Sequence, residues 1–249
     1  MQYTKGYVGF IDILGFGKYV SEKNNSKTIK DLFYFINKFQ SFFNESSLSV
    51  KIAFFSDTII LTVEEIEKNN LSMLFTAIEM AENYLFKHTQ LYFRGAIAKG
   101  YYYNNDGIAF GPAIVSAYEL EKKAKYSRII LDEDVYLDIQ EKTIDVFKDF
   151  DGEYCYNTFV RKILFDISHD LNKENLKAKI KEERQLLCKA IKRNYNTNVA
   201  EKYLWRILPF NEFCDNLPIF LKELKIEFGE EELLEFKALK IRLIEFKSV

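Results

Sequence analysis

The chain has 249 residues, of which 48% are hydrophobic, so it is globular and long enough for one large domain or a domain with an appended subdomain. Its 35 basic and 37 acidic residues nearly cancel, and the formal charge of -2 excludes a general attraction to nucleic acid or an anionic membrane. The three cysteines and two histidines form no CxxC or zinc motif, and no stretch approaches the roughly 18 apolar residues of a membrane span. We therefore expect a soluble, cytoplasmic protein with no nucleic-acid or membrane partner.

Three elements are predicted in the first 65 residues. Residues 4–14 are rich in β-branched and aromatic types and end at Gly15, which predicts a strand followed by a turn, with Asp12 near the strand end. Apolar side chains recur at spacings of three and four over residues 28–43, the pattern of an amphipathic helix. Residues 50–63 read as a hairpin with Asp57 in its turn.

The next segment continues the alternation of helices and strands. Residues 70–88 carry one apolar stripe and predict a helix, and residues 91–100 read as a buried strand. Residues 104–107, Asn-Asn-Asp-Gly, predict a hairpin turn, and Pro112 begins a helix that extends to residue 125. A last strand is expected at residues 128–132.

This order of elements predicts an α+β fold, with an antiparallel-rich sheet and helices on one face. We assign it to a domain of residues 1–150. Residues 151–249 are expected to form a mostly helical C-terminal extension packed on that domain, with a charged helix at 171–194 and an amphipathic helix at 230–247.

Two aspartates stand in apolar surroundings, Asp12 at the end of the first strand and Asp57 in the hairpin turn. A buried carboxylate is costly unless a cation or hydrogen bonds compensate it. Neighbouring strands lie about 4.8 Å apart, so the two carboxylates could reach one ion. Magnesium and manganese accept such oxygen ligands while substrate phosphates complete the shell. The alternative is that Asp57 only occupies a turn and Asp12 only caps the following helix.

Backbone and cationic groups near these aspartates could bind phosphate. The loop at residues 14–18, Leu-Gly-Phe-Gly-Lys, offers amides at a strand-to-helix junction, where amides and the helix dipole both favour anions. Arg94 lies in an apolar strand, where its charge needs a phosphate or a carboxylate. A buried ion pair with Asp57 or Glu121 is the structural alternative for Arg94.

Two further side chains have a binding and a structural interpretation. Lys99 could contact substrate or extend its amine to solvent. Tyr118 could stack on a base or pack in the core. Glu121 is interpreted as structural, and His88 and His169 are given no role.

Four segments in order resemble successive motifs of the class III nucleotidyl cyclase catalytic domain, at residues 10–16, 55–57, 94–100 and 111–124. The resemblance covers roughly residues 5–135. It is strongest to the bacterial pyrimidine cyclases of the Pycsar antiphage systems, through Gly111-Pro112-Ala113, the segment 117–121 and Arg128-Ile129. Asp151-Gly152 and residues 202–205 also resemble that family's C-terminal region.

The resemblance implies a two-metal reaction. Two divalent ions, Mn²⁺ or Mg²⁺, would be held by Asp12, Asp57 and the Ile13 carbonyl, and the 3′-hydroxyl of a nucleoside triphosphate would attack its own α-phosphorus. Asp12, Asp57 and Arg94 are the expected catalytic residues. The expected substrate-binding residues are Phe10, Ile13, Leu14, Gly15, Phe16, Arg94, Lys99 and Tyr118.

The chain departs from purine cyclases at two positions. Where those enzymes carry a ribose-orienting Asn and, four residues later, a transition-state Arg, this chain has Val115 and Glu119. An adenylate cyclase is therefore disfavoured, and Arg94 becomes the candidate substitute cation. The hypothesis is a pyrimidine nucleotide cyclase that makes cUMP from UTP or cCMP from CTP in antiphage defence.

Such a chain is expected to act as a homodimer with sites at the interface, and a separate cyclic-nucleotide-binding effector would read the product. Two alternatives stay open. One is a cyclase for ATP or GTP with an atypical base pocket. The other is a catalytically silent nucleotide-binding or dimerisation module.

Overall fold

The computed structural model describes residues 2–22, 30, 34–39, 41, 43, 50–65, 70–139, 146–159, 173–194 and 197–215. Its contacts divide the chain into two compact units. The first unit comprises Met1–Phe147 and Tyr154–Thr158, and the second comprises Lys148–Glu153 and Phe159–Val249. The short segment Tyr154–Thr158, which the sequence places in the C-terminal extension, thus belongs to the first unit.

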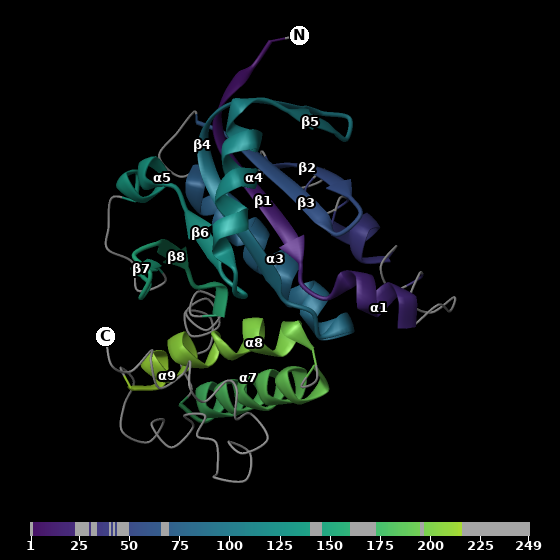
Figure 1. The fold of residues 1–249 in the computed structure, drawn as a ribbon, viewed down its shortest axis with the longest axis vertical. Coiled ribbons are helices and arrows are strands. Elements are labelled where there is room, and N and C mark those ends of the chain that lie inside the picture. Colours follow the sequence, from purple (N-terminus) through teal and green to yellow (C-terminus); the bar gives the residue numbers. More distant parts are fainter. Residues whose placement is uncertain are drawn as a thin grey trace. The chain divides into compact units, whose positions relative to one another are not determined.

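The first unit is built on one mixed sheet with strand order β2-β3-β1-β4-β6-β8-β7, and β5 pairs with β4 (Figure 1). Strand β1 pairs antiparallel with both β3 and β4, whereas β4 and β6 are parallel. The strands are β1 (Thr4–Ile13), β2 (Val50–Phe55), β3 (Thr58–Glu64), β4 (Phe93–Asn105), β5 (Ile108–Phe110), β6 (Ile129–Leu131), β7 (Val146–Lys148) and β8 (Tyr154–Tyr156).

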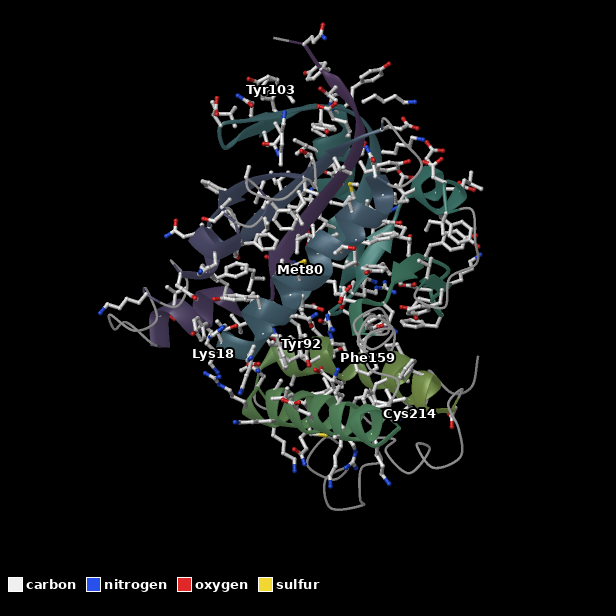
Figure 2. The ribbon with its side chains drawn as sticks, turned by 180° about the vertical axis from the view of Figure 1, so that it is seen from behind. Lys18, Met80, Tyr92, Tyr103, Phe159 and Cys214 are labelled. Atoms are coloured by element: carbon white, nitrogen blue, oxygen red, sulfur yellow. The ribbon has the colours of Figure 1, made fainter. Side chains whose placement is uncertain are left out.

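Helices cover both faces of this sheet, and the α+β class is confirmed. Helix α4 (Pro112–Ala124) packs on the face to which Val8 and Ala98 contribute, as the front of Figure 1 shows. Helix α3 (Asn70–Thr89), which carries Met80, covers the opposite face in Figure 2. The expectation of helices on one face is therefore wrong. Central strands with apolar side chains on both sides need cover on both sides.

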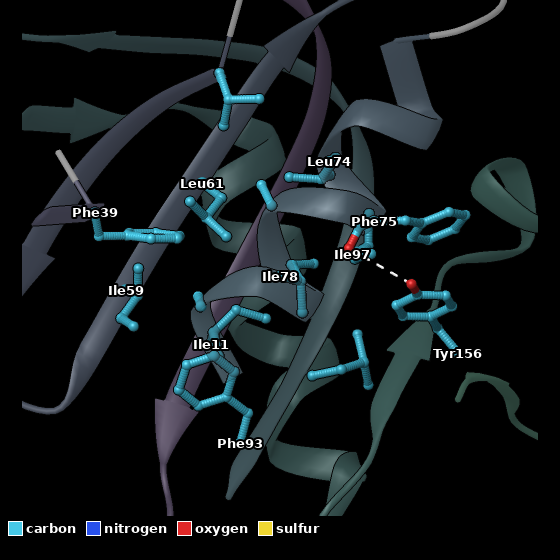
Figure 3. Close-up of a cluster of buried hydrophobic side chains, with 14 of the residues drawn as sticks. Ile11, Phe39, Ile59, Leu61, Leu74, Phe75, Ile78, Phe93, Ile97 and Tyr156 are labelled. Carbon is cyan, nitrogen blue, oxygen red and sulfur yellow. Dashed lines mark hydrogen bonds between the residues drawn. The ribbon is translucent and has the colours of Figure 1, made fainter. Parts of the chain in front are cut away.

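The main core lies between the sheet and α3 (Figure 3). Its buried aliphatic side chains come from alternate positions of three strands and from one face of the helix, namely Ile11, Ile59, Leu61, Ile97, Leu74 and Ile78. Each such side chain contributes about 1.5–3 kcal/mol when fully buried. Tyr156 stacks on Phe75 at a centroid distance of 4.2 Å and donates its hydroxyl to the Phe75 carbonyl at 3.5 Å, which links β8 to α3.

Most predicted elements of residues 1–132 are confirmed, including the first strand, the 50–63 hairpin and both helices that flank β4 and β5. The strand expected at residues 91–100 is longer and reaches Asn105. Residues 30, 34–39, 41 and 43 are helical, and the other residues of the helix expected at 28–43 lie outside the described residues. The helix implied after the 14–18 loop is the short α1 (Phe16–Glu22), whose bounds the sequence did not define. The sequence did not predict the short helix α5 (Glu133–Leu137) or the strands β7 and β8.

The described part of the second unit is mainly helical, with α7 (Lys173–Arg193), α8 (Asn198–Leu204) and α9 (Ile207–Asp215). Thr197 caps α8 by accepting a hydrogen bond from the Val199 amide at 3.2 Å. The indole of Trp205 donates to Asp149 at 2.8 Å. The helix predicted at residues 230–247 lies outside the described residues. Among the helices that the structure describes, none is long and apolar enough to cross a membrane.

Candidate active site

Strand pairing brings Asp12 and the Asp57 turn together. In the register of β1 and β3, Asp12 lies opposite Thr58, the residue that follows the turn. The Ile13 amide also donates to the Asp57 carbonyl at 2.9 Å. The left-handed residue of this turn is Ser56, with φ 57°, so the turn geometry does not depend on the Asp57 side chain. Both aspartates thus occupy the strand-end positions that the sequence predicts.

Arg94 lies between two carboxylates. It is opposite Asp12 in the register of β1 and β4, and its Nη2 donates to Asp12 Oδ2 at 2.8 Å. Its Nε lies 2.7 Å from Oε1 of Glu121 on α4. The two groups form an ion pair, but the N–H of Nε does not point at the oxygen as a hydrogen bond requires. The side chains of Arg94, Asp12 and Glu121 are 22%, 20% and 7% exposed. The expected Glu121 contact is present, and the Asp12 contact is one that the sequence did not predict.

The backbone around Arg94 is fixed from both sides. The Phe93 amide donates to the buried Glu82 carboxylate at 3.0 Å, and the Gly95 amide donates to the Arg128 carbonyl at 3.0 Å. A Cβ at Gly95 would lie 2.5 Å from the Phe10 carbonyl oxygen, so only glycine permits this approach of β4 to β1. These contacts hold Arg94 opposite Asp12.

Phe10 and Tyr118 meet on the same face of the sheet. Their rings form an edge-to-face pair with centroids 5.4 Å apart. Tyr118 is 43% exposed, and Lys122 Nζ lies 4.0 Å from its ring centroid. Tyr118 is thus a partly open aromatic surface beside β1 and not a core residue.

Fewer backbone amides than expected are available for phosphate binding in the loop after β1. Gly15 has φ 82°, which permits the sharp turn into α1. The Ile13 amide is bonded to Asp57, and the Leu14 amide donates to the Tyr92 carbonyl at 3.0 Å. Phosphate contacts by amides of this loop would therefore fall to Gly15, Phe16 and the residues that follow them in the loop.

Lys99 is not brought together with these residues. It lies five residues after Arg94 on β4, and because side chains alternate along a strand it projects from the opposite face. There its Nζ contacts Glu65 at 2.5 Å and Asp138 at 2.7 Å. Burial acts to lower the pKa of Lys99, but the two carboxylates outweigh it and raise the pKa. Burial and the Asp138 carboxylate, which accepts the Tyr7 hydroxyl at 3.0 Å, raise the pKa of Tyr7 to about 12.

Val115 and Glu119 lie on the outer side of α4. Val115 is 60% exposed, and Glu119 is also exposed and pairs with Lys122 at 2.7 Å. Residues four apart share one side of a helix, so these two side chains lie next to each other on the surface. Neither residue contacts Asp12 or Arg94 in any described interaction.

The donor set of this site consists of oxygens. Asp12, Asp57 and the Ile13 carbonyl would be hard ligands, and within the described ranges no three His, Cys, Asp or Glu side chains gather as a complete metal centre. Magnesium typically takes one or two protein carboxylates and completes its shell with water and phosphate oxygens. The residues therefore fit a divalent ion that binds together with a nucleotide.

No protein family and no curated protein matches the sequence of this chain. Similar solved structures include the adenylyl cyclase CyaB from P. aeruginosa, with 15% identity over 62% of this chain and 92% of that chain and a TM-score of 0.47. The guanylate cyclase domain of RhGC from Catenaria anguillulae, solved with GTP, has 15% identity, coverages of 62% and 95% and a TM-score of 0.46. The guanylyl cyclase Cya2 has 13% identity, coverages of 63% and 93% and a TM-score of 0.47. Such low identities and TM-scores assign the chain neither a family nor an activity.

Proposed function

We propose that this chain is a metal-dependent nucleotidyl cyclase that converts UTP or CTP into its 3′,5′-cyclic nucleotide and pyrophosphate. The observation that carries the proposal is the pairing of β1 with both β3 and β4. It brings Asp12, the Asp57 turn and Arg94 to one end of the sheet. These are the positions at which the sequence resembles the metal and phosphate motifs of class III cyclases.

In the proposed reaction, Asp12, Asp57 and the Ile13 carbonyl would hold two divalent ions, Mg²⁺ or Mn²⁺. When bound, such ions would lower the pKa of the ribose 3′-hydroxyl and neutralise the charge of the pyrophosphate. The amides of Gly15 and Phe16 orient the phosphate chain. The 3′-hydroxyl gives its proton to solvent water, the 3′-oxygen bonds to the α-phosphorus, and the bond from that phosphorus to the pyrophosphate oxygen breaks, so that pyrophosphate leaves.

Arg94 would supply the positive charge that Glu119 cannot. A guanidinium placed near the α-phosphate stabilises the charge that develops on its oxygens in the transition state. Arg94 is already at the site through its contact with Asp12. This assignment makes Arg94 the counterpart in function, but not in position, of the arginine of purine cyclases.

The substrate proposal rests on the outer side of α4 and on Tyr118. Val115 and Glu119 replace the residues that serve purine cyclases, and Phe10 with Tyr118 offers an aromatic edge against which a single-ring base could stack. Together with the Pycsar-like segments, this favours a pyrimidine nucleotide over ATP or GTP.

The assembly and cellular role are proposed on the same resemblance. Two copies would form a C₂ dimer with sites at their interface. The cyclic pyrimidine nucleotide would serve as a cytoplasmic signal of phage infection, read by a separate effector that binds cyclic nucleotides.

Incubation of the purified chain with Mn²⁺ and each of the four nucleoside triphosphates tests the proposal. Formation of cUMP or cCMP, lost in Asp12→Asn, supports it. Formation of only cAMP or cGMP identifies the purine alternative. Nucleotide binding by calorimetry with no cyclic product identifies the silent module.

A further inference from the structure

The pairing of Arg94 has a consequence for metal binding. Arg94 already pairs with the carboxylate of Asp12, and its Nη2 lies 2.8 Å from Oδ2. A cation that binds Asp12 would approach this occupied carboxylate. The guanidinium occupies one carboxylate oxygen, and its positive charge repels a divalent ion. Arg94 and the ion therefore compete for Asp12.

Glu121 holds the other side of the same guanidinium. Its carboxylate is 7% exposed, comes from α4 instead of the sheet, and lies 2.7 Å from Arg94 Nε. The Nη1 group of Arg94 takes part in neither contact. The Glu121 contact can therefore persist when the contact with Asp12 is broken.

We infer that Arg94 is a latch on the metal site, released from Asp12 by the incoming ion and retained beside the site by Glu121. The inference rests on the proposed function for the identity of the ion. Glu121 is then a positioning residue. By sharing the charge of Arg94, it weakens the hold of Arg94 on Asp12, and after release it keeps the freed Nη groups near the phosphates.

This account predicts opposite effects for two substitutions. Arg94→Gln removes the competitor and should tighten Mn²⁺ binding by about fivefold, at the lower end of couplings between contacting charged residues. Glu121→Gln removes the second carboxylate, so Arg94 would pair more strongly with Asp12 and Mn²⁺ binding should weaken by a similar factor. In the double variant R94Q/E121Q, the loss of Glu121 should have little further effect, because Glu121 acts through Arg94.

The affinities are measured by Mn²⁺ electron paramagnetic resonance on the full chain without nucleotide, and circular dichroism confirms that each variant is folded. Lys5→Gln is the matched control. It removes one positive charge and one ion pair from the same strand as Asp12, and it should leave Mn²⁺ affinity unchanged. If R94Q does not fold, comparison of R94Q/E121Q with E121Q measures the same competition.

Tighter binding without Arg94, together with weaker binding in E121Q, supports the latch. Equal affinities in all the proteins, including no measurable binding by any of them, would overturn it. So would a loss of affinity on removal of Arg94, or an equal effect of Glu121→Gln with and without Arg94. Because no nucleotide is present, an inactive protein that follows the predicted order refutes only the proposed function. An active cyclase that does not follow the order refutes only the latch.

Discussion

The Asp57→Asn substitution separates a catalytic aspartate from a turn residue. The amide is nearly the same size as the carboxylate, so the change removes a charge and little volume. The turn should persist, because the Asp57 backbone carbonyl still accepts the Ile13 amide and Ser56 still carries the left-handed conformation. We expect the free energy of unfolding to change by no more than about 0.5 kcal/mol, as is usual for partly exposed positions.

The expected effect on turnover is large. Unit charges 4 Å apart interact by about 4 kcal/mol at an effective dielectric constant near 20. If Asp57 holds an ion that stabilises the transition state, removal of its charge should lower kcat/KM by about a thousandfold.

The matched control is Asp106→Asn, in the turn between β4 and β5. Asp106 also lies in a hairpin turn and has φ 52°, which asparagine tolerates. The assay measures pyrophosphate release and cyclic product from UTP and CTP, alongside thermal unfolding of both variants. A D57N protein that cyclises nucleotide within tenfold of the unchanged chain would refute the metal-ligand assignment. Equal losses of activity in D57N and D106N would show a general effect of turn substitutions instead.

Two further predictions concern stability. Gly95→Ala should destabilise the fold by about 1–3 kcal/mol, because its Cβ would lie 2.5 Å from the Phe10 carbonyl oxygen. Gly17→Ala is the control, because a Cβ at Gly17 would meet no atom within 4 Å, and its melting temperature should not fall. Equal melting temperatures for the two variants would contradict the close approach of β1 and β4. The hydrogen bond with Lys99 lowers the pKa of Glu65 below 4.5, so this ionised group stabilises the fold above that pH and loses its effect as the pH falls through the lowered pKa. The difference in unfolding free energy between the unchanged chain and Glu65→Gln should thus be constant near neutral pH and shrink in acid; a difference that grows in acid would refute this sign.

Local patterns were enough to predict the sheet-forming hairpin and the helices that flank β4. The apolar spacing of residues 70–88 and the proline at residue 112 define α3 and α4 because helix periodicity and caps are local signals. Strand β8 was not predicted, because its three residues are too few to show an alternation of apolar and polar side chains. Its pairing with β6 joins segments that are separated in the sequence. The cover on both faces was also missed, although the apolar residues at alternate positions of β1 on each face indicate it.

The candidate site was also predicted only where local signals define it. The strand-end positions of Asp12 and Asp57 follow from local turn signals. The Asp12–Arg94 pair depends on the register of β1 with β4, which a single strand does not specify. The placement of Lys99 could have been predicted, since residues five apart in a strand lie on opposite faces. Its partners Glu65 and Asp138 could not, because other segments supply them.

Cyclisation of a pyrimidine nucleotide at this site can be tested directly. The most direct test gives the purified chain an equimolar mixture of ATP, GTP, UTP and CTP with Mn²⁺ and identifies the products by mass spectrometry, with Asp12→Asn as the blank. The account predicts that cUMP or cCMP is the main product and that pyrophosphate appears in equal amount. No cyclic product, or cyclic purine nucleotides alone, would contradict it.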